Sequence, residues 1–372
     1  MTMSSTTTSS HYESHFRAES YEKGYFSESE SPYMENLVKH LRDRLQMSSS
    51  QQQEETTTEE GPRRRRCILD IGGGTGNFAQ ALLQNDNTSR IVVVDPFLVP
   101  ATTATTTTST STTTTTAQSS SGGGNNSNNN NNCSIDDNIV SFVKAPAEDF
   151  LFPPSSNNDD NNCWRTSVID REYDGYDQIL IKEAVHHFDE KDRVGIFRGM
   201  REGLRSQRRR TSSVSSTTTS TAATDDDDSI NETTVITPSV LIVTRPQTDI
   251  DYPFWDEALD VWKKNQPSIE TIENDLKTAG FTNIQRSVES FPCSISLHRW
   301  QLMIRTRFWS TFSNFNDDEL DRACEIIAAE ATAATAATTT NTKANADSKN
   351  DDDDDDDIIL HFEDRLIFLT AS

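Results

Sequence analysis

The residues best suited to chemistry stand in one stretch near the start of the chain, residues 67–83, which read CILDIGGGTGNFAQALL. An acid, Asp70, closes a short apolar run, and four glycines follow within five positions: Gly72, Gly73, Gly74 and Gly76. Glycine lets a backbone turn with positive φ and lie against a ligand without a Cβ between them. Apolar residues at helical spacing come next, so the stretch predicts a strand, a tight turn and a helix that together bind a nucleotide.

A second acid, Asp95, closes the next apolar run, residues 90–95, which read RIVVVD. Near-continuous β-branched runs are typical of parallel strands buried on both faces. Asp95 lies 19 positions after Gly76, where an acid at the end of a second strand can accept both hydroxyls of a ribose. The alternative is that Asp95 and Pro96 only begin a turn.

A third group of reactive side chains follows the predicted strand near residue 180: Lys182, Glu183, His186 and His187. Ligands of open parallel sheets lie beyond the carboxyl ends of the strands, so these side chains are expected where chemistry happens. One histidine could serve as a general base for a hydroxyl or amine nucleophile. The alternative is that both histidines only cap or pack.

Two classes of nucleotide site begin with such a glycine turn. Residues 74–79, GTGNFA, satisfy the G-x-G-x-x-A form of the dinucleotide fingerprint. Residues 70–76, DIGGGTG, also form an acid-x-G-x-G-x-G pattern. In this pattern the chain resembles the class I (seven-strand, Rossmann-like) S-adenosylmethionine-dependent methyltransferases, and specifically their small-molecule, type 11-like branch. A carboxylate would repel a pyrophosphate, so Asp70 favours the sulfonium cofactor.

The resemblance implies a role for each matched residue on the cofactor side. Asp70 is expected at the methionine end of S-adenosylmethionine, with the glycine turn beneath the ribose and methionine. Residues 145–150, APAEDF, resemble the A-E-D-L segment that holds the adenine edge, although Pro146 stands where the family often has Asp. The expected cofactor-binding residues outside the turn are therefore Asp95, Pro96, Ala147, Glu148 and Lys182.

On the acceptor side, residues 182–188, KEAVHHF, resemble the ending of the fourth strand in small-molecule enzymes, which makes His186 and His187 the candidate catalytic residues. Residues 182–185 lack the Pro-Pro-aromatic motif of nucleic-acid amino-methylating enzymes, and Glu183 stands without a partner glutamate. A small-molecule methyl acceptor is therefore expected. Candidate substrate-binding residues are four aromatics and one guanidinium that could pair with a carboxylate: Tyr25, Tyr252, Trp255, Trp300 and Arg305. The alternative is that the aromatics are core and the arginine is solvated.

The expected fold is α/β: a doubly wound, mostly parallel seven-stranded sheet with an antiparallel last strand, a helical cap and several disordered low-complexity insertions. Residues 1–62 are expected to form a disordered start, an N-terminal cap helix and a linker, and residues 63–372 the methyltransferase domain. The expected insertions are residues 101–138, 153–170, 206–235 and 331–357, and the expected substrate cap is residues 291–330.

Composition limits the partners and the location. The chain has 372 residues and a net charge of −25, but eleven of its acids lie in two aspartate runs of the kind that are usually solvated. Such acidity argues against a nucleic-acid partner. Five cysteines without a C-x-x-C pair indicate free thiols, no metal site and a cytoplasmic location. No apolar run is long enough to span a membrane. The oligomeric state is left open.

Two other classes of function stay open beside the methyltransferase. A Rossmann oxidoreductase dependent on NAD(P) would explain the glycines and Asp95 but not Asp70. A non-catalytic binding protein with a methyltransferase fold would keep the cofactor motifs and lack turnover.

Overall fold

The computed structural model describes residues 33–47, 65–84, 86, 88–96, 140–151, 175–204, 237–342 and 358–372. Several expectations lie outside these residues: the role of Tyr25, the start of the chain, and the insertions at 101–138, 153–170 and 206–235.

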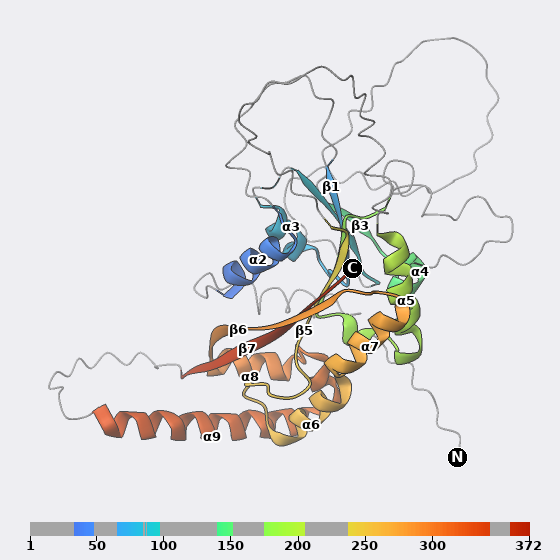
Figure 1. Ribbon diagram of the computed structural model, residues 1–372. Coiled ribbons are helices and arrows are strands. Elements are labelled where there is room, and N and C mark those ends of the chain that lie inside the picture. Colours follow the sequence, from blue (N-terminus) through green and yellow to red (C-terminus); the bar gives the residue numbers. More distant parts are fainter. Residues whose placement is uncertain are drawn as a thin grey trace, which may run out of the picture.

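One seven-stranded sheet organises the described residues, in the order β3-β2-β1-β4-β5-β7-β6 (Figure 1). Strands β1 to β5 pair in parallel, and β7 runs antiparallel to both of its neighbours, β5 and β6. This topology confirms the predicted fold class. The strands are β1 (Arg66–Ile71), β2 (Ser89–Val94), β3 (Val140–Val143), β4 (Gln178–Lys182), β5 (Ser239–Thr244), β6 (Ile284–Ser296) and β7 (Ile359–Ala371).

The register brings the ends of the parallel strands to one edge of the sheet. Ile71 at the end of β1 pairs with Val94 of β2 on one side and with Ile181 of β4 on the other. Every residue of β1 is buried, as expected for a central parallel strand with both faces covered. The segments that leave β1, β2, β3, β4 and β5 therefore meet at this edge.

Helices cover both faces of the sheet. On one face α2 (Tyr33–Arg44) and α3 (Asn77–Leu83) share a core with residues such as Ile68 and Phe368. On the other face lie α4 (Ala147–Leu151), α5 (Glu190–Gly203) and α7 (Ile269–Ala279). Figure 1 shows the two groups on opposite sides of the strands. Helix α2 thus packs onto the sheet as part of the same core, rather than standing apart from the domain.

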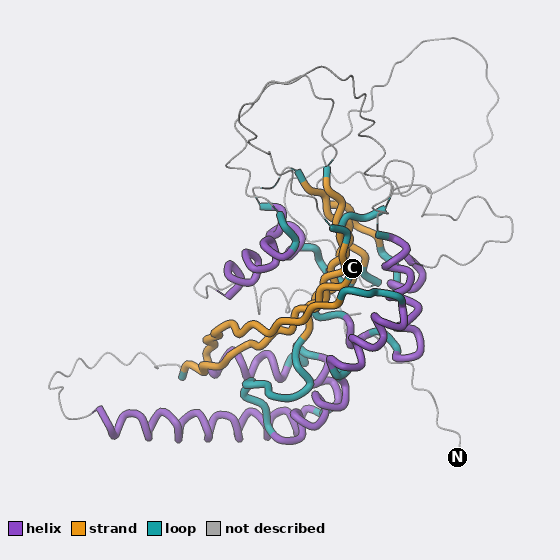
Figure 2. The backbone as a smooth tube through the Cα atoms, in the orientation of Figure 1, coloured by secondary structure: helices purple, strands orange, loops and turns teal. Residues whose placement is uncertain are grey.

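A third apolar cluster holds the cap beyond the edge of the sheet. It is built on α6 (Asp256–Asn265), α8 (Leu297–Arg305), the 3-10 helix η5 (Ser310–Asn314) and α9 (Asp317–Thr342). These helices lie beneath the long β6–β7 ribbon in Figures 1 and 2. The cluster is strongly aromatic, which gives a small cap a large buried apolar area.

Two boundaries differ from the sequence-based expectations. The region expected as a cap from residue 291 begins inside β6, which continues to Ser296 because it pairs with β7 along its whole length. Helix α9 continues through residues 331–342, where an unstructured insertion was expected. Its start is a capping box, in which Glu319 N–H donates to Asn316 Oδ1 and Asn316 N–H to Glu319 Oε2. The alanines after Ile327 favour continuing the helix.

Candidate functional site

The glycine turn after β1 is shaped by three positive φ angles, 77° at Gly72, 56° at Gly74 and 79° at Gly76. A Cβ on Gly72 would overlap the side chain of Ala184, and one on Gly76 would overlap the ring of Phe142. A Cβ on Gly74 would meet nothing within 4 Å. The turn is therefore packed tightly against the strand ends at two positions and open at the third, as a surface for a ligand requires.

Asp70 lies directly under this turn, because a Cβ on Gly73 would overlap its carboxylate. The residue is only 2% exposed. Burial raises the pKa of Asp70 to about 7, and the neighbouring charge of Asp95 adds to the rise while Lys182 opposes it. When both Asp70 and Asp95 are ionised, they carry more negative charge than Lys182 balances. Such a site suits a cationic ligand and disfavours a pyrophosphate.

Asp95 approaches the same turn from the end of β2. Its Oδ2 accepts a hydrogen bond from Gly74 N–H at 3.0 Å, and its own N–H donates to Val143 O at 3.1 Å. Pro96 follows it. Helix α4 begins just beyond β3 with Ala147 buried and Glu148 exposed. The structure therefore brings the predicted cofactor residues to three adjacent strand ends.

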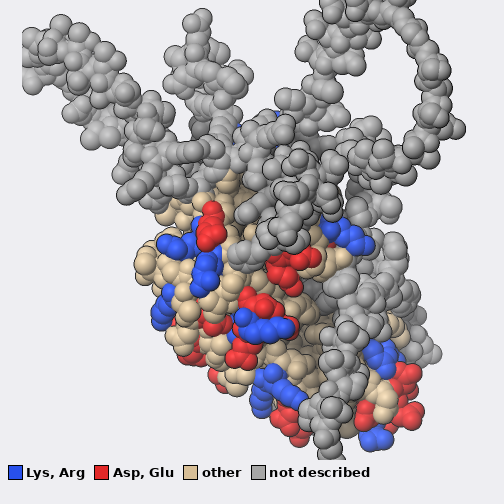
Figure 3. Space-filling model, turned by 90° about the vertical axis from the view of Figure 1, so that its right-hand side faces the viewer, with Lys and Arg blue, Asp and Glu red and all other residues tan. Residues whose placement is uncertain are grey.

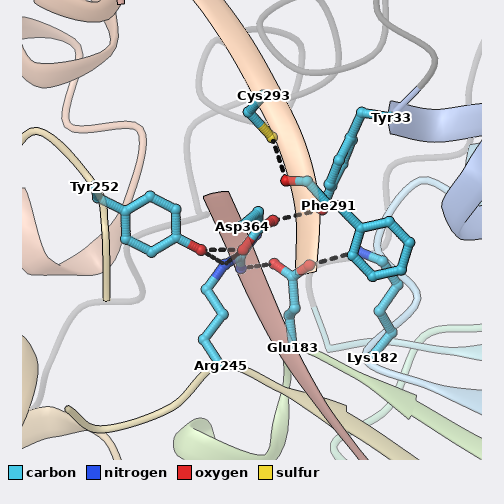
Figure 4. Close-up of polar contacts among 8 residues, drawn as sticks. All are labelled: Tyr33, Lys182, Glu183, Arg245, Tyr252, Phe291, Cys293 and Asp364. Atoms are coloured by element: carbon cyan, nitrogen blue, oxygen red, sulfur yellow. Dashed lines mark hydrogen bonds and ion pairs between the residues drawn. The ribbon is translucent and has the colours of Figure 1, made fainter. Parts of the chain in front are cut away.

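A chain of alternating charges starts at the end of β4 (Figure 4). Lys182 Nζ lies 2.9 Å from Glu183 Oε1 and 5.0 Å from the centre of the Phe78 ring. Arg245, from the end of β5, binds Glu183 on one side and Asp364 of β7 on the other. The chain links the surroundings of Asp70 to the last strand of the sheet.

Asp364 is fully buried and accepts hydrogen bonds from three side chains, one on α2 and two in the loop after β5. Its Oδ2 accepts from Tyr33 Oη of α2 at 2.5 Å and from Arg245 Nη2 at 3.1 Å. Its Oδ1 accepts from Tyr252 Oη and from Arg245 Nε. These bonds hold α2, the loop after β5 and β7 together beside the strand ends.

Glu183 is held in an unusual backbone conformation, with φ at 54°. Left-handed φ is costly for a non-glycine residue and persists only where surrounding contacts enforce it. Burial alone would raise the pKa of Glu183, but the charges and hydrogen bonds of Arg245 and Lys182 outweigh it and lower the pKa to about 2. The carboxylate is therefore charged at any physiological pH.

The two candidate catalytic histidines stand on the 3-10 helix η3 (Val185–His187), with their rings 4.0 Å apart. His187 is exposed, whereas His186 is half-buried and lines a cavity. Burial, the neighbouring His187 and Arg245 lower the pKa of His186 well below its usual value, against the opposing charge of Glu183. The lowered pKa keeps the His186 imidazole neutral, and its place in the cavity wall makes His186, rather than His187, the histidine that can contact a molecule there.

The cavity beside His186 has a volume of about 40 Å³. It lies between the ends of β4 and β5 and the cap, and polar and apolar atoms both form its walls. The lining residues are Glu183, His186, Thr244, Arg245, Trp262, Gln266, Trp309, Ser310 and Thr311.

The expected substrate residues lie elsewhere. Trp255 stacks on Phe312, and Trp300 is buried with its Nε1–H donating to Pro253 O at 3.0 Å. Tyr252 belongs to the Asp364 network, and Arg305 binds Asp321 on the exposed face of α8 at 2.8 Å. None of these four residues lines the cavity, because the aromatics form the core of the cap and the guanidinium already has a surface partner.

Sequence reasoning did not select Arg245, Trp262, Gln266 or Asp364 for the site. Arg245 directly follows β5, so its position at a strand end was a usable signal. Trp262 lies in α6, Gln266 directly follows that helix, and Asp364 lies in β7. Trp262 and Gln266 line the cavity with His186 only because the cap folds back onto the strand ends, which no local pattern contains.

Three further features of the described residues concern surface charge, metal ligands and membrane-spanning helices. Figure 3 shows Lys and Arg interspersed with Asp and Glu on the face it presents, without a basic patch of the kind that binds nucleic acid. Among the residues described, no cluster of His, Cys, Asp and Glu is arranged to hold a metal ion. No helix in the described ranges is long and apolar enough to cross a membrane.

The sheet order, with the last strand inserted antiparallel between β5 and β6, gives this chain the seven-strand, Rossmann-like fold of the class I methyltransferases. No protein-family model matches the chain, and no curated protein matches it significantly. The function of the chain is therefore inferred from its fold and its own residues.

Solved structures similar to this chain include methyltransferases. Phosphoethanolamine N-methyltransferase 2 of Haemonchus contortus, in complex with S-adenosylmethionine, is 12% identical with a TM-score of 0.39, and the match covers 95% of this chain and 56% of that protein. The YcgJ protein of Bacillus subtilis is 11% identical with a TM-score of 0.39, and the match covers 91% of this chain and 98% of that protein. Human N-acetylserotonin methyltransferase is 11% identical with a TM-score of 0.28, covering 59% and 43%. At these values we take no activity or substrate from them.

Proposed function

We propose that this chain is an S-adenosylmethionine-dependent methyltransferase that acts on a small molecule. The observation that supports this most directly is the buried Asp70 under an open glycine turn, with a second acid, Asp95, against the same turn. The excess negative charge fits the cationic methionine end of the cofactor. The open surface at Gly74 fits the rest of that ligand.

The residues that would hold the cofactor come from neighbouring strand ends. Asp70 would bind the cationic end, Asp95 with Pro96 the ribose, and Ala147 with Glu148 the adenine edge, while Lys182 would tune the charge of Asp70. When bound, the cofactor supplies a methyl group already activated by its sulfonium. The chain's own task is then to align the acceptor, exclude water and accept a proton.

The two alternatives differ in what they require of this site. A dinucleotide would place its pyrophosphate beside Asp70 and Asp95, where charge repulsion opposes binding. A non-catalytic binding protein would need no base and no acceptor cavity, whereas here His186 lines a cavity next to the strand ends. We also propose a cytoplasmic location, which the free thiols of Cys67, Cys293 and Cys324 support.

Calorimetric titration of the full chain with S-adenosylmethionine, and separately with NAD, tests the proposal. We expect the sulfonium cofactor to bind, NAD not to bind, and Asp95→Ala to weaken binding about tenfold or more. Asp260→Ala, which removes an exposed acid from α6, is the matched control and should bind like the wild type. Binding of NAD without S-adenosylmethionine would support the oxidoreductase and overturn the proposal.

A further inference from the structure

Two residues that line the cavity beside His186 each carry a buried polar atom that lacks a hydrogen-bond partner within the described part of the chain. The two atoms are the indole N–H of Trp309, a donor, and the amide Oε1 of Gln266, an acceptor. Trp309 is 6% exposed and Gln266 is 7% exposed. A buried polar group without a partner costs about 1–3 kcal/mol, so two around one cavity call for a ligand that pairs with both.

The charged residues of the cavity wall are already satisfied. Arg245 binds Glu183 and Asp364, and Glu183 also binds Lys182. The two cations and two acids balance one another, so the wall offers no net charge to a ligand. The polar groups that remain for recognition are neutral: the indole, the amide, and the hydroxyls of Thr244, Ser310 and Thr311.

We propose that this cavity receives the hydroxyl end of an uncharged small molecule, which is the methyl acceptor of the proposed methyltransferase. A hydroxyl accepts one hydrogen bond and donates another, so it pairs with the Trp309 N–H and the Gln266 oxygen together. The identification of this molecule as the methyl acceptor rests on the proposed function. The preference for an uncharged hydroxyl rests on the polar groups of the cavity alone.

Charged acceptors fit this cavity less well. A carboxylate can accept from Trp309 but cannot donate to Gln266. An ammonium can donate to Gln266 but cannot accept from Trp309. Each leaves one buried polar atom unpaired, which is the condition under which a polar site discriminates strongly.

The size of the cavity limits how much of the acceptor enters. A volume of about 40 Å³ holds roughly three groups of the size of water, so it admits a hydroxyl and one or two carbons rather than a ring. The remainder of the acceptor would extend from the cavity. His186 lies in the same wall.

Three probes with the same carbon chain separate these possibilities: 1-butanol, butyrate and butylammonium. Their binding to the full-length chain would be measured by saturation-transfer NMR titration at pH 7.5, without cofactor. We expect 1-butanol to bind about fivefold or more tightly than either charged probe. Trp309→Phe, which keeps a ring and removes the N–H, and Gln266→Met, which removes the amide, should each weaken 1-butanol about five- to tenfold.

Gln301→Met is the matched control, since it removes an amide from the same cap but its side chain binds Cys324 O outside the cavity. It should leave 1-butanol binding unchanged. Equal or tighter binding of a charged probe, no binding of 1-butanol, or an unchanged affinity in Gln266→Met would overturn the inference. The probe experiment contains no cofactor, so it tests only the binding chemistry of the cavity. Titration with S-adenosylmethionine tests the methyltransferase proposal separately.

Discussion

The two halves of the site treat buried acids in opposite ways. On the proposed cofactor side burial raises the pKa of Asp70 to about 7, because Lys182 does not offset it. On the proposed acceptor side the pKa of Glu183 is lowered to about 2, because Arg245 and Lys182 more than offset its burial. The two carboxylates lie at neighbouring strand ends of one sheet.

This contrast distinguishes an acid that is available to bind a ligand from an acid that stabilises the fold. An acid left short of positive charge keeps its binding capacity for a cation that comes from outside. An acid saturated by Arg245 and Lys182 has none left, and acts instead to hold the walls of the cavity in place. Replacing residues on each side should therefore change stability in opposite directions.

The largest effect is expected where the saturated network is broken. Arg245→Met would leave Glu183 and Asp364 buried without their shared cation, and should lower the free energy of unfolding by about 3–5 kcal/mol. Urea unfolding followed by circular dichroism would measure it. Arg286→Met, which removes a half-exposed ion pair with Glu270, is the control and should cost less than about 1 kcal/mol. Equal losses in the two variants would mean that the network does not stabilise the fold.

The opposite sign is expected at the cofactor side. The folded-state pKa of Asp70 lies above its ordinary 3.8, so its contribution to stability is full below pH 3.8 and is lost as pH rises through 7. Asp70→Asn removes the ionisable carboxyl, and with it the loss of stability at high pH. The free energy of unfolding at pH 8 should therefore rise by about 2–4 kcal/mol, and cofactor binding should be abolished.

Asp177→Asn is the matched control for this substitution. Asp177 is equally buried, but its Oδ2 accepts a hydrogen bond from Cys67 N–H at 2.9 Å, so its replacement should give no gain in stability. The same urea unfolding at pH 8 compares the two variants. A loss of stability in Asp70→Asn would show that the acid is satisfied in the folded protein, and the contrast between the two halves would fail.

A smaller effect is expected in the pH dependence of cofactor binding. A cationic ligand binds the charged form of Asp70, which is the minor form below pH 7. The affinity for S-adenosylmethionine should therefore rise about tenfold between pH 6 and pH 8. Calorimetry at a series of pH values would show the rise. An affinity that falls over this range, as expected for a ligand that prefers the protonated acid, would contradict the assignment of Asp70.

The position of the glycine turn and its two acids could be predicted almost completely from the sequence, because these residues are local. Asp70 and the glycines form one turn, and Asp95 ends the next strand, so period and spacing were enough to predict them. Helix ends also depend on local residues. The Ser268 side chain accepts the N–H of Thr271 at the start of α7, and Gly280 ends that helix with φ at 99°.

The acceptor side could not be predicted in the same way, because it is assembled by long-range contacts. Trp309, Gln266 and Arg245 come from separate elements, and their shared cavity depends on the packing of the cap. The aromatic residues that looked most like a substrate pocket, Trp255 and Trp300, form the core of that cap instead. An aromatic pattern in a sequence shows that a cluster exists, but not which members remain at its surface.

The smallest effect concerns the link between α2 and the saturated network. Tyr33→Phe removes one hydrogen bond to Asp364, which keeps those from Arg245 and Tyr252. The free energy of unfolding should fall by about 1 kcal/mol, because the aromatic ring still packs against Phe291 and the carboxylate stays charged and paired. Cofactor affinity should not change, since the contacts given above join Tyr33 to Asp364 and Phe291 and not to Asp70 or Asp95. A weaker affinity in this variant would show that the charge chain couples α2 to Asp70, and the two halves would have to be treated as one.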